Sequence, residues 1–172
     1  SLNETNQRLT EEIETRRTAE AQLRLSAEVF ENATESIVIT DAGHRILKVN
    51  SAFTRTTGYA AEEVVGLTPR ILRSDSVEQM HLDAAMWASL EKDGQWQGEL
   101  LAKSRTGEEI PGWISIKGVL DERGKVTHHV SIMSDLSQRK AAELQEKIDS
   151  LADIERTLPQ RPRATRQGGA TR

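Results

Sequence analysis

The chain has 172 residues, with 23 basic and 27 acidic side chains, a formal net charge of −4 and no cysteine. This length suits one domain with attachments, and the charged share of 29% exceeds the roughly 25% of an average globular chain, so we expect part of the chain to be solvated helix or tail. The lack of cysteine excludes disulfides, thiolate nucleophiles, thiolate metal ligands and light sensing through a cysteinyl–flavin adduct.

The first segment is predicted to be a helix, because it is rich in helix formers and holds no Pro or Gly before Gly43. We assign residues 1–26 to an N-terminal connector of coiled-coil type, with the helix continuing to about residue 30. A heptad reading places apolar side chains at the core positions Leu2, Leu9, Ile13, Leu23, Ala27 and Phe30. Arg16 and Glu20 interrupt this seam. We expect the helix to serve a dimer, and the alternative is a surface helix packed on its own domain.

Residues 27–136 are predicted to form one α+β domain. An apolar, β-branched hairpin over 36–50 turns at 41–44, short helical pieces follow to about residue 73, and a longer helix covers 76–91. The 3/4 spacing of that helix assigns these residues to its core face: Val77, Met80, Ala84, Trp87 and Leu90. Three strands over 95–104, 109–120 and 125–135, joined by Gly-containing turns, complete a five-stranded antiparallel sheet.

A C-terminal helix is predicted over 137–155, with Ser137 as its N-cap. Residues 16–22 and 139–145 share one pattern of two cations, two small residues, Glu, an apolar residue and Gln, so similar connectors enter and leave the domain. Residues 156–172 hold five Arg and no acid, and we predict a basic, disordered tail there. The tail has no aromatic residue for stacking on bases, so we expect no nucleic-acid partner.

The order of several motifs resembles that of a PAS domain of the sensory-box type, as found in bacterial histidine kinases and in GGDEF or EAL signalling proteins. The resemblance rests on several stretches, which are F-E-N-A (30–33), the hairpin I-T-D-A-G-H-R-I (39–46), V-N-S-A-F (49–53) with T-G-Y (57–59), E-E (62–63) and Gly66, M-W (86–87) with G-Q-W-Q-G-E (94–99) and R-T-G-E (105–108), and S-D-L-S (134–137) with R-K (139–140). It covers about 110 residues in the expected order. It implies a PAS fold, with a five-stranded antiparallel sheet and a helical flank enclosing a small pocket, plus N- and C-terminal connector helices.

The function implied by this resemblance is sensing, with transmission to an attached output domain. A helix that leaves directly from the last strand would couple any repacking of the sheet to the rotation or register of that helix. Asp135 lies at this strand–helix junction, and we assign it a signal-relay role through backbone N–H bonds or a cation. The alternative is a plain acid at the start of a helix. Glu62 or Glu63 is expected to pair with Arg105.

The resemblance also suggests pocket residues, namely Trp87, His81, His129 and Met133, with Ser131 facing the same way. Flavin-binding PAS domains carry a Trp near position 87, but Ala102 stands where such members have Asn. Haem would need a His on the long helix, where His81 is predicted. The adjacent His128 and His129 point to opposite faces of a strand and cannot hold one metal together. His44 is expected to be exposed in its turn. The cofactor is left unknown, and a pocket that is empty or holds another small molecule is expected ahead of flavin or haem.

The sequence lacks the motifs of common enzymes, including G-x-S-x-G, a phosphate-binding Gly-rich loop and H-E-x-x-H. We therefore expect a non-catalytic sensory and signal-relay module that acts as a homodimer, with a fragment of a diguanylate cyclase or histidine kinase as a related possibility. A ligand-free dimerisation module is the alternative. Because no secretion signal or long apolar span is found, we expect a cytoplasmic protein or the cytoplasmic part of a membrane-associated one.

Overall fold

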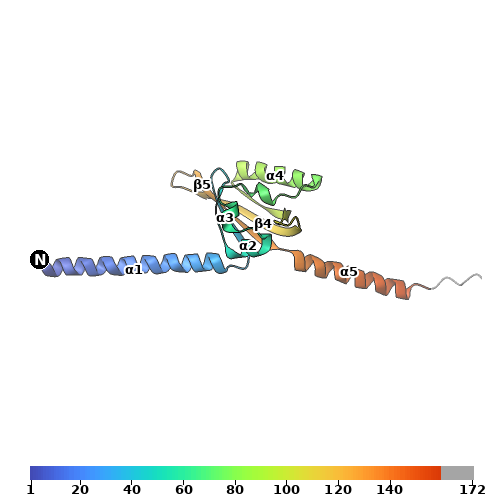
Figure 1. The fold of residues 1–172 in the computed structure, drawn as a ribbon, viewed down its shortest axis with the longest axis horizontal. Helices are drawn as coiled ribbons and strands as arrows, with labels where there is room; N and C mark the ends of the chain where they lie inside the picture. Colours follow the sequence, from blue (N-terminus) through green and yellow to red (C-terminus); the bar gives the residue numbers. More distant parts are fainter. Residues whose placement is uncertain (160–172) are drawn as a thin grey trace, which may run out of the picture. The chain divides into compact units, whose positions relative to one another are not determined.

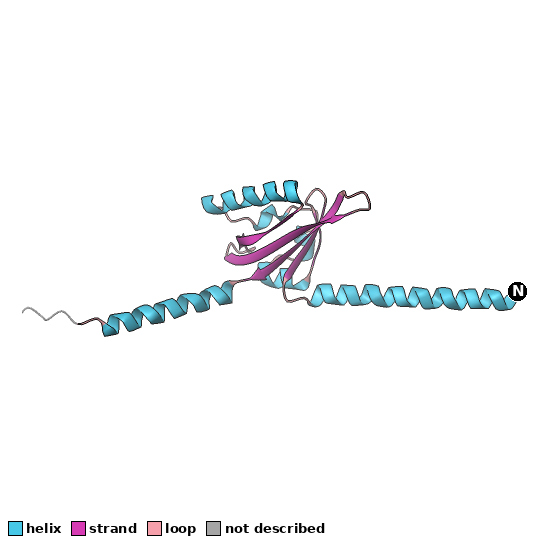
Figure 2. Ribbon diagram, turned by 180° about the vertical axis from the view of Figure 1, so that it is seen from behind, coloured by secondary structure: helices cyan, strands magenta, loops and turns pink. Residues whose placement is uncertain are grey.

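A computed structural model describes residues 1–159 of the chain, and Figures 1 and 2 show the arrangement of its elements. The helix α1 (Leu2–Asn32) comes first and is followed by the strands β1 (Ser36–Asp41) and β2 (Ile46–Val49). Four helical segments then precede the remaining strands, namely α2 (Ser51–Thr57), α3 (Ala61–Val64), the 3₁₀ turn η1 (Pro69–Leu72) and α4 (Val77–Asp93). The chain continues through β3 (Gln95–Lys103), β4 (Glu109–Leu120), β5 (Val126–Asp135) and α5 (Ser137–Thr157).

The strands form one antiparallel sheet in the order β2-β1-β5-β4-β3, which confirms the predicted α+β fold. The helical segments carry the chain from the β2 edge to the β3 edge, and α4 packs against β3 while α2 packs against β1. The last strand then returns to the middle of the sheet, between β1 and β4. As a result, the strand that follows α1 and the strand that precedes α5 are neighbours.

The core consists of two clusters of buried apolar side chains. One contains Val38, Ile46, Val49, Phe53 and Val64. The other contains Ala102, Ile110 and Met133. The first cluster packs the β1–β2 hairpin against the short helices α2 and α3. The second cluster packs side chains of β3, β4 and β5 against one another.

Asn50 joins four parts of the domain through its side chain, as the N-cap of α2. Its Oδ1 accepts hydrogen bonds from the backbone N–H of Ile37 and Phe53, each at 3.0 Å. Its Nδ2 donates to the carbonyl oxygens of Phe30 at 3.0 Å and Glu35 at 2.9 Å. The Asn50 side chain, only 1% exposed, is itself shielded from water, and its bonds connect the end of α1, the following loop, β1 and α2.

The core face predicted for α4 is partly wrong. Val77 is 71% exposed and Met80 is 46% exposed, and Ala84 is also exposed. The buried side chains of the helix are instead those of Gln79, Met86 and Leu90. The predicted face and the buried face both satisfy helical spacing. The buried face includes the polar Gln79, so a pattern of hydrophobic residues alone favoured the other face.

The connector helices extend beyond the boundaries expected from the sequence. α1 continues without a break past residue 26 to Asn32, and α5 reaches Thr157, so the first residues of the predicted tail are helical. Residues 160–172 of that tail lie outside the described part. Ser137 is the first residue of α5 rather than its cap. The chain divides into two compact units, Ser1–Ser137 and Gln138–Arg172. In the described part, no helix is long and apolar enough to cross a bilayer.

Replacing Asn50 tests the importance of its network for stability. We expect Asn50→Ala to lower the free energy of unfolding by about 3–5 kcal/mol, because four buried or part-buried backbone groups lose their partner. Asn32→Ala is the matched control, since Asn32 is exposed and bonds only within its own helix. Urea unfolding followed by circular dichroism measures both variants, and equal stabilities would contradict the assigned role.

Candidate functional site

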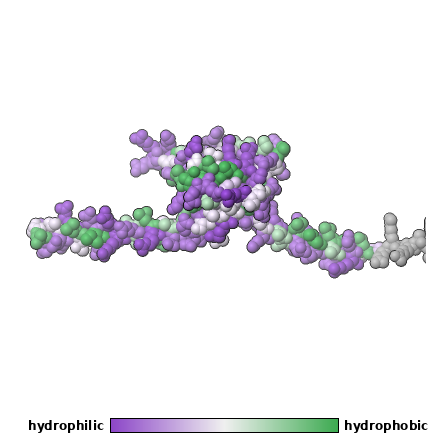
Figure 3. Space-filling view, in the orientation of Figure 1, coloured by the Kyte–Doolittle hydropathy of each residue, from purple (hydrophilic) through white to green (hydrophobic). Residues whose placement is uncertain are grey.

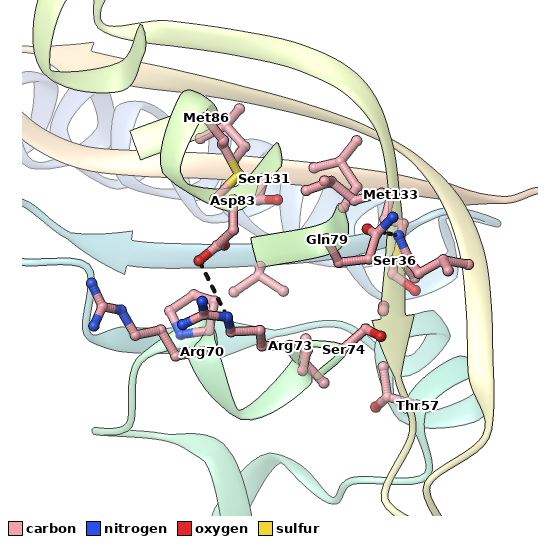
Figure 4. A pocket seen from close by; sticks show the side chains of 18 of the residues that line it. Ser36, Thr57, Arg70, Arg73, Ser74, Gln79, Asp83, Met86, Ser131 and Met133 are labelled. Atoms are coloured by element: carbon pink, nitrogen blue, oxygen red, sulfur yellow. Dashed lines mark hydrogen bonds and ion pairs between the residues drawn. The ribbon is translucent and has the colours of Figure 1, made fainter. Parts of the chain in front are cut away.

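A cavity of about 110 Å³ lies between the sheet and the helical segments of the first unit (Figure 4). Its apolar wall includes Val38, Phe53, Met86, Ile114 and Met133, which come from five different elements. Side chains from β1, β5 and β4 reach it because alternate residues of a strand point to the same face. In the chain, β1 is the first strand after α1 and β5 is the last strand before α5.

The polar groups of the cavity are mostly satisfied by the protein itself. The Nε of Arg73 lies 3.5 Å from Oδ2 of Asp83, and Figure 4 shows the Asp83 carboxylate turned toward Arg73. Gln79 accepts a 2.8 Å hydrogen bond from the backbone N–H of Leu101, which ties α4 to β3. The buried hydroxyl of Ser36 is an exception, because it has no hydrogen-bond partner.

A group of side chains that we call the rim cluster, His44, Trp87, His129 and Arg70, adjoins the cavity. The His44 ring stacks on the His129 ring, with centroids 4.4 Å apart. The His44 and Trp87 rings are arranged in a T shape, with centroids 4.5 Å apart. The Arg70 guanidinium lies 5.7 Å from the centre of the Trp87 ring. Trp87 and Arg70 also line the cavity. The Nε1 of Trp87 and the Nδ1 of His129 are buried without partners among the described residues.

The surroundings of His44 lower its pKa. Burial is the main cause, because it disfavours the charged imidazolium, and nearby His129 and Arg70 act in the same direction. The carboxylates of Asp41 and Glu91 oppose this effect without reversing it. The sequence reading placed His44 in solvent, which is wrong. Its backbone is left-handed, with a φ of 64°, and its ring stacks on His129 instead of extending into water.

The predicted pocket residues have different surroundings. Trp87 and Met133 line the cavity, as does Ser131. His129 is buried but belongs to the rim cluster and not to the cavity wall. His81 is exposed on α4 and lies outside the wall. Sequence reasoning missed Arg70, because a single Arg in an irregular segment carries no periodic signal.

Two further predicted polar residues have defined partners. Oδ1 of Asp135 accepts a 2.8 Å hydrogen bond from the backbone N–H of Ser137, at the start of α5. The signal-relay role of Asp135 stays a prediction. The expected ion pair of Arg105 forms with Glu63, at 2.8 Å, and since both side chains are partly exposed it adds little to stability.

The cavity does not fit a flavin or a haem. Its volume is about 110 Å³, whereas clefts for larger ligands measure roughly 300–1,000 Å³. From β3 it receives only the apolar Leu100, Leu101 and Ala102, which offer no side-chain partner to the polar edge of a flavin. Neither His81 nor His129 lines the wall. Across residues 1–159, no group of three or more His, Asp or Glu side chains could hold a metal ion.

Comparison with known proteins relates this architecture to a sensory family. Residues 34–138, more than half of the chain, match the model of the PAS domain family. The bacterioopsin transcriptional activator of Halobacterium salinarum is 32% identical over 139 residues, which cover 78% of this chain and 20% of that protein. A nitrogen fixation regulatory protein of Klebsiella oxytoca is 32% identical over 109 residues, which cover 63% of this chain and 22% of that protein.

The match with a solved structure concerns the fold. The crystal structure of the PAS domain of a protein from Colwellia psychrerythraea superposes with a TM-score of 0.61 and 21% identity, covering 67% of this chain and 98% of that one. By contrast, the chain spans only about a fifth of the length of the curated relatives described above. The likeness to those relatives is therefore a likeness to one module within each of them.

The lowered pKa of His44 makes stability depend on pH. The unfolded chain takes up a proton at this residue at a higher pH than the folded chain, so the free energy of unfolding falls as the pH drops below about 6.5. We expect His44→Gln to lose less stability than the wild type between about pH 7.5 and pH 5.5. His81→Gln is the control, because His81 is exposed. Urea unfolding across this range measures the slopes, and a wild-type slope in His44→Gln would contradict the expectation.

Proposed function

The chain belongs to the PAS domain family, and we propose that it is the sensory and signal-relay module of a cytoplasmic signalling protein. In this proposal the cavity or a dimer interface receives the signal, and the connector helices pass it to an output domain. The observation that carries the proposal is the pairing of Ser36 with Met133, because both residues line the cavity and each is four residues away in the chain from a connector helix, which ends at Asn32 or begins at Ser137.

The β5 side of this pair supports transmission toward the C-terminus. Ser131 and Met133 form part of the cavity wall, and β5 ends two residues later at Asp135. Only Leu136 separates β5 from α5, and its backbone N–H donates a 2.8 Å hydrogen bond to the carbonyl of Pro111 on β4. The Asp135 carboxylate then bonds to the N–H of Ser137. A shift of β5 therefore reaches the first turn of α5 without a flexible linker.

The β1 side supports transmission from or toward the N-terminal helix. Ser36 is the first residue of β1, and the preceding Glu35 accepts a hydrogen bond from the Ser134 hydroxyl of β5. The carbonyl of Glu35 accepts from Asn50, which also binds the carbonyl of Phe30 at the end of α1. The exit of α1 and the end of β5 are thus joined by hydrogen bonds within the first unit.

A second candidate function, dimerisation without a ligand, is favoured by the exposed apolar side chains of both connector helices. Figure 3 shows hydrophobic patches spaced along α1 and along α5. On α5 the exposed residues Leu144, Ile148 and Leu151 are spaced by four and three residues, which is the spacing of a coiled-coil seam, and the exposed Leu158 follows seven residues later, just past the end of the helix. We propose a homodimer through these helices, which is compatible with either function.

The output domain is proposed to be a GGDEF or EAL domain or a histidine kinase, and the chain itself is proposed to be non-catalytic. The transcriptional activator and the nitrogen fixation regulator named above are regulatory proteins in which the matched segment is a small part. This supports a module that acts through a larger protein. We propose no direct nucleic-acid partner.

Filling the cavity tests the relay. We expect Ala102→Leu, which adds volume at a buried wall position of β3, to change amide hydrogen exchange at residues 34–37 and 134–139 by about fivefold or more, the equivalent of roughly 1 kcal/mol. Hydrogen exchange of the whole chain by mass spectrometry measures this. Ala88→Leu, on the exposed side of α4, is the control. Changes confined to β3 and β4 would argue against transmission through the cavity.

Charged substitutions in the α5 seam test the dimer. We expect Leu144→Glu with Leu151→Glu to weaken self-association by about tenfold or more, because two carboxylates would be buried in the seam. Sedimentation equilibrium measures the association constant. Ala142→Glu with Ser150→Glu adds the same charge at exposed positions outside the seam and should leave the constant unchanged. If both double variants behave alike, the seam is not the interface.

A further inference from the structure

The enclosed volume of the cavity limits its ligand to a few atoms. An apolar cavity of roughly 150 Å³ accommodates benzene, so a cavity of about 110 Å³ encloses about four or five non-hydrogen atoms. Two methionines, Met86 of α4 and Met133 of β5, form part of the wall, and their unbranched side chains adapt to the shape of what they contact. The cavity therefore suits a compact molecule, and a long chain or a fused ring system exceeds its volume.

The surface inside the cavity is mostly apolar. Besides the two methionines, the wall includes Val38, Phe53, Leu72, Ala102 and Ile114. Such a lining holds water poorly, because a buried water molecule needs about two to four polar partners. Burying an apolar molecule here removes its surface from water at no cost in lost hydrogen bonds. The lining therefore favours hydrocarbon groups.

The charged residues of the wall offer no buried counter-charge to a ligand. Arg73 and Asp83 neutralise one another, with 3.5 Å between the Nε and Oδ2 atoms (Figure 4). Arg70, the third charged residue of the described wall, is exposed to solvent. A charged ligand would lose its water shell on entry without gaining a buried partner of opposite charge. The cavity therefore selects against both cations and anions.

Several neutral polar side chains of the wall are already engaged within the protein. The Thr57 hydroxyl donates a 2.8 Å hydrogen bond to the carbonyl of Phe53, and the Ser74 hydroxyl donates one of 2.8 Å to Glu109. The side-chain oxygen of Gln79 accepts from a backbone N–H of β3. Drawing these groups toward a ligand would break bonds that hold the domain together.

The other polar groups of the wall add little. The hydroxyl of Ser36 and the indole N–H of Trp87 are buried within the wall, out of reach of a molecule in the cavity. Ser131 contributes one further hydroxyl, which is uncharged. Shape and apolar contact are therefore the interactions by which this cavity recognises a ligand.

We propose that the cavity binds a compact, uncharged hydrocarbon of about four or five carbon atoms, held by apolar contact. This inference rests on the proposed sensory function and names the chemical class of its ligand. A smaller molecule would leave part of the wall without contacts, and a larger one would force the wall apart.

Titration of the full chain with cyclopentane tests the proposal. The readout is the set of methionine methyl resonances in ¹H–¹³C NMR spectra, since the chain has three Met. Met86 and Met133 line the cavity, whereas Met80 is 46% exposed on α4 and lies outside the wall. We expect cyclopentane to shift the methyl resonances of Met86 and Met133 and to leave that of Met80 in place.

Matched probes test the chemical class. Pyrrolidinium chloride and sodium propionate carry a positive and a negative charge on an equal number of non-hydrogen atoms, and both should bind about tenfold more weakly than cyclopentane or worse. Cycloheptane has more apolar surface, which would favour tighter binding in a wider pocket. We expect it to bind no more tightly than cyclopentane.

Three variants locate the binding. Ala102→Leu should abolish cyclopentane binding by filling the cavity, and Ala88→Leu should leave it unchanged, because Ala88 is exposed and outside the wall. Ile114→Val enlarges the cavity by one carbon with little risk to the fold, and it should raise the affinity for cycloheptane relative to cyclopentane by about fourfold.

Three results would overturn the proposal. They are no shift of the Met86 and Met133 methyl groups up to the solubility of cyclopentane, a Met80 shift of the same size as theirs, and charged probes that bind as well as cyclopentane.

The outcome for the ligand class is separable from that for the relay. If cyclopentane does not bind while Ala102→Leu changes hydrogen exchange at residues 34–37 and 134–139, the hydrocarbon inference fails and the relay stands. If cyclopentane binds but exchange at those residues ignores Ala102→Leu, the relay fails and the ligand class stands.

Discussion

In the middle of the sheet the first strand of the chain pairs with the last one, and Ser36 lies opposite Met133. The other main features depend on this pairing. Both residues contribute to the cavity wall, and the pairing brings the loop after α1 close to the end of β5, where the Ser134 hydroxyl donates a hydrogen bond to Glu35. The cavity wall thus includes residues of two strands whose outer ends are the attachment points of helices, and the proposed relay rests on this arrangement.

The polar groups of the domain divide into two kinds. Asn50 uses its full hydrogen-bonding capacity on four backbone groups, as expected of a buried amide that holds a fold together. Ser36 and Trp87, by contrast, belong to the cavity wall and carry a buried hydroxyl and a buried indole N–H that have no partner in the described chain. Residues that violate a rule of stability while lining a cavity are typical of sites kept for binding.

Much of the fold could be predicted from the chain alone, because its signals are local. Apolar alternation and the Gly-containing turns indicated each strand, and Gly94, a residue type that commonly ends helices, stops α4 in a left-handed conformation. The site was harder to predict. The core face of α4 begins with Gln79, which a hydrophobic pattern cannot select, and its burial depends on the backbone N–H of Leu101 on a distant strand. The stacking of His44 on His129 likewise joins residues far apart in sequence.

The sequence by itself determined the fold class, the two connector helices and the directness of the β5–α5 junction, since these follow from periodicity and turn residues over short stretches. Only the tertiary structure decided the volume of the cavity, the pairing of Arg73 with Asp83 and the stacking of His44 on His129. The reason is physical. An ion pair or a ring contact forms only between groups that lie within a few ångströms of one another, and Arg73 and Asp83 come from the residue after η1 and from α4, which only folding brings together.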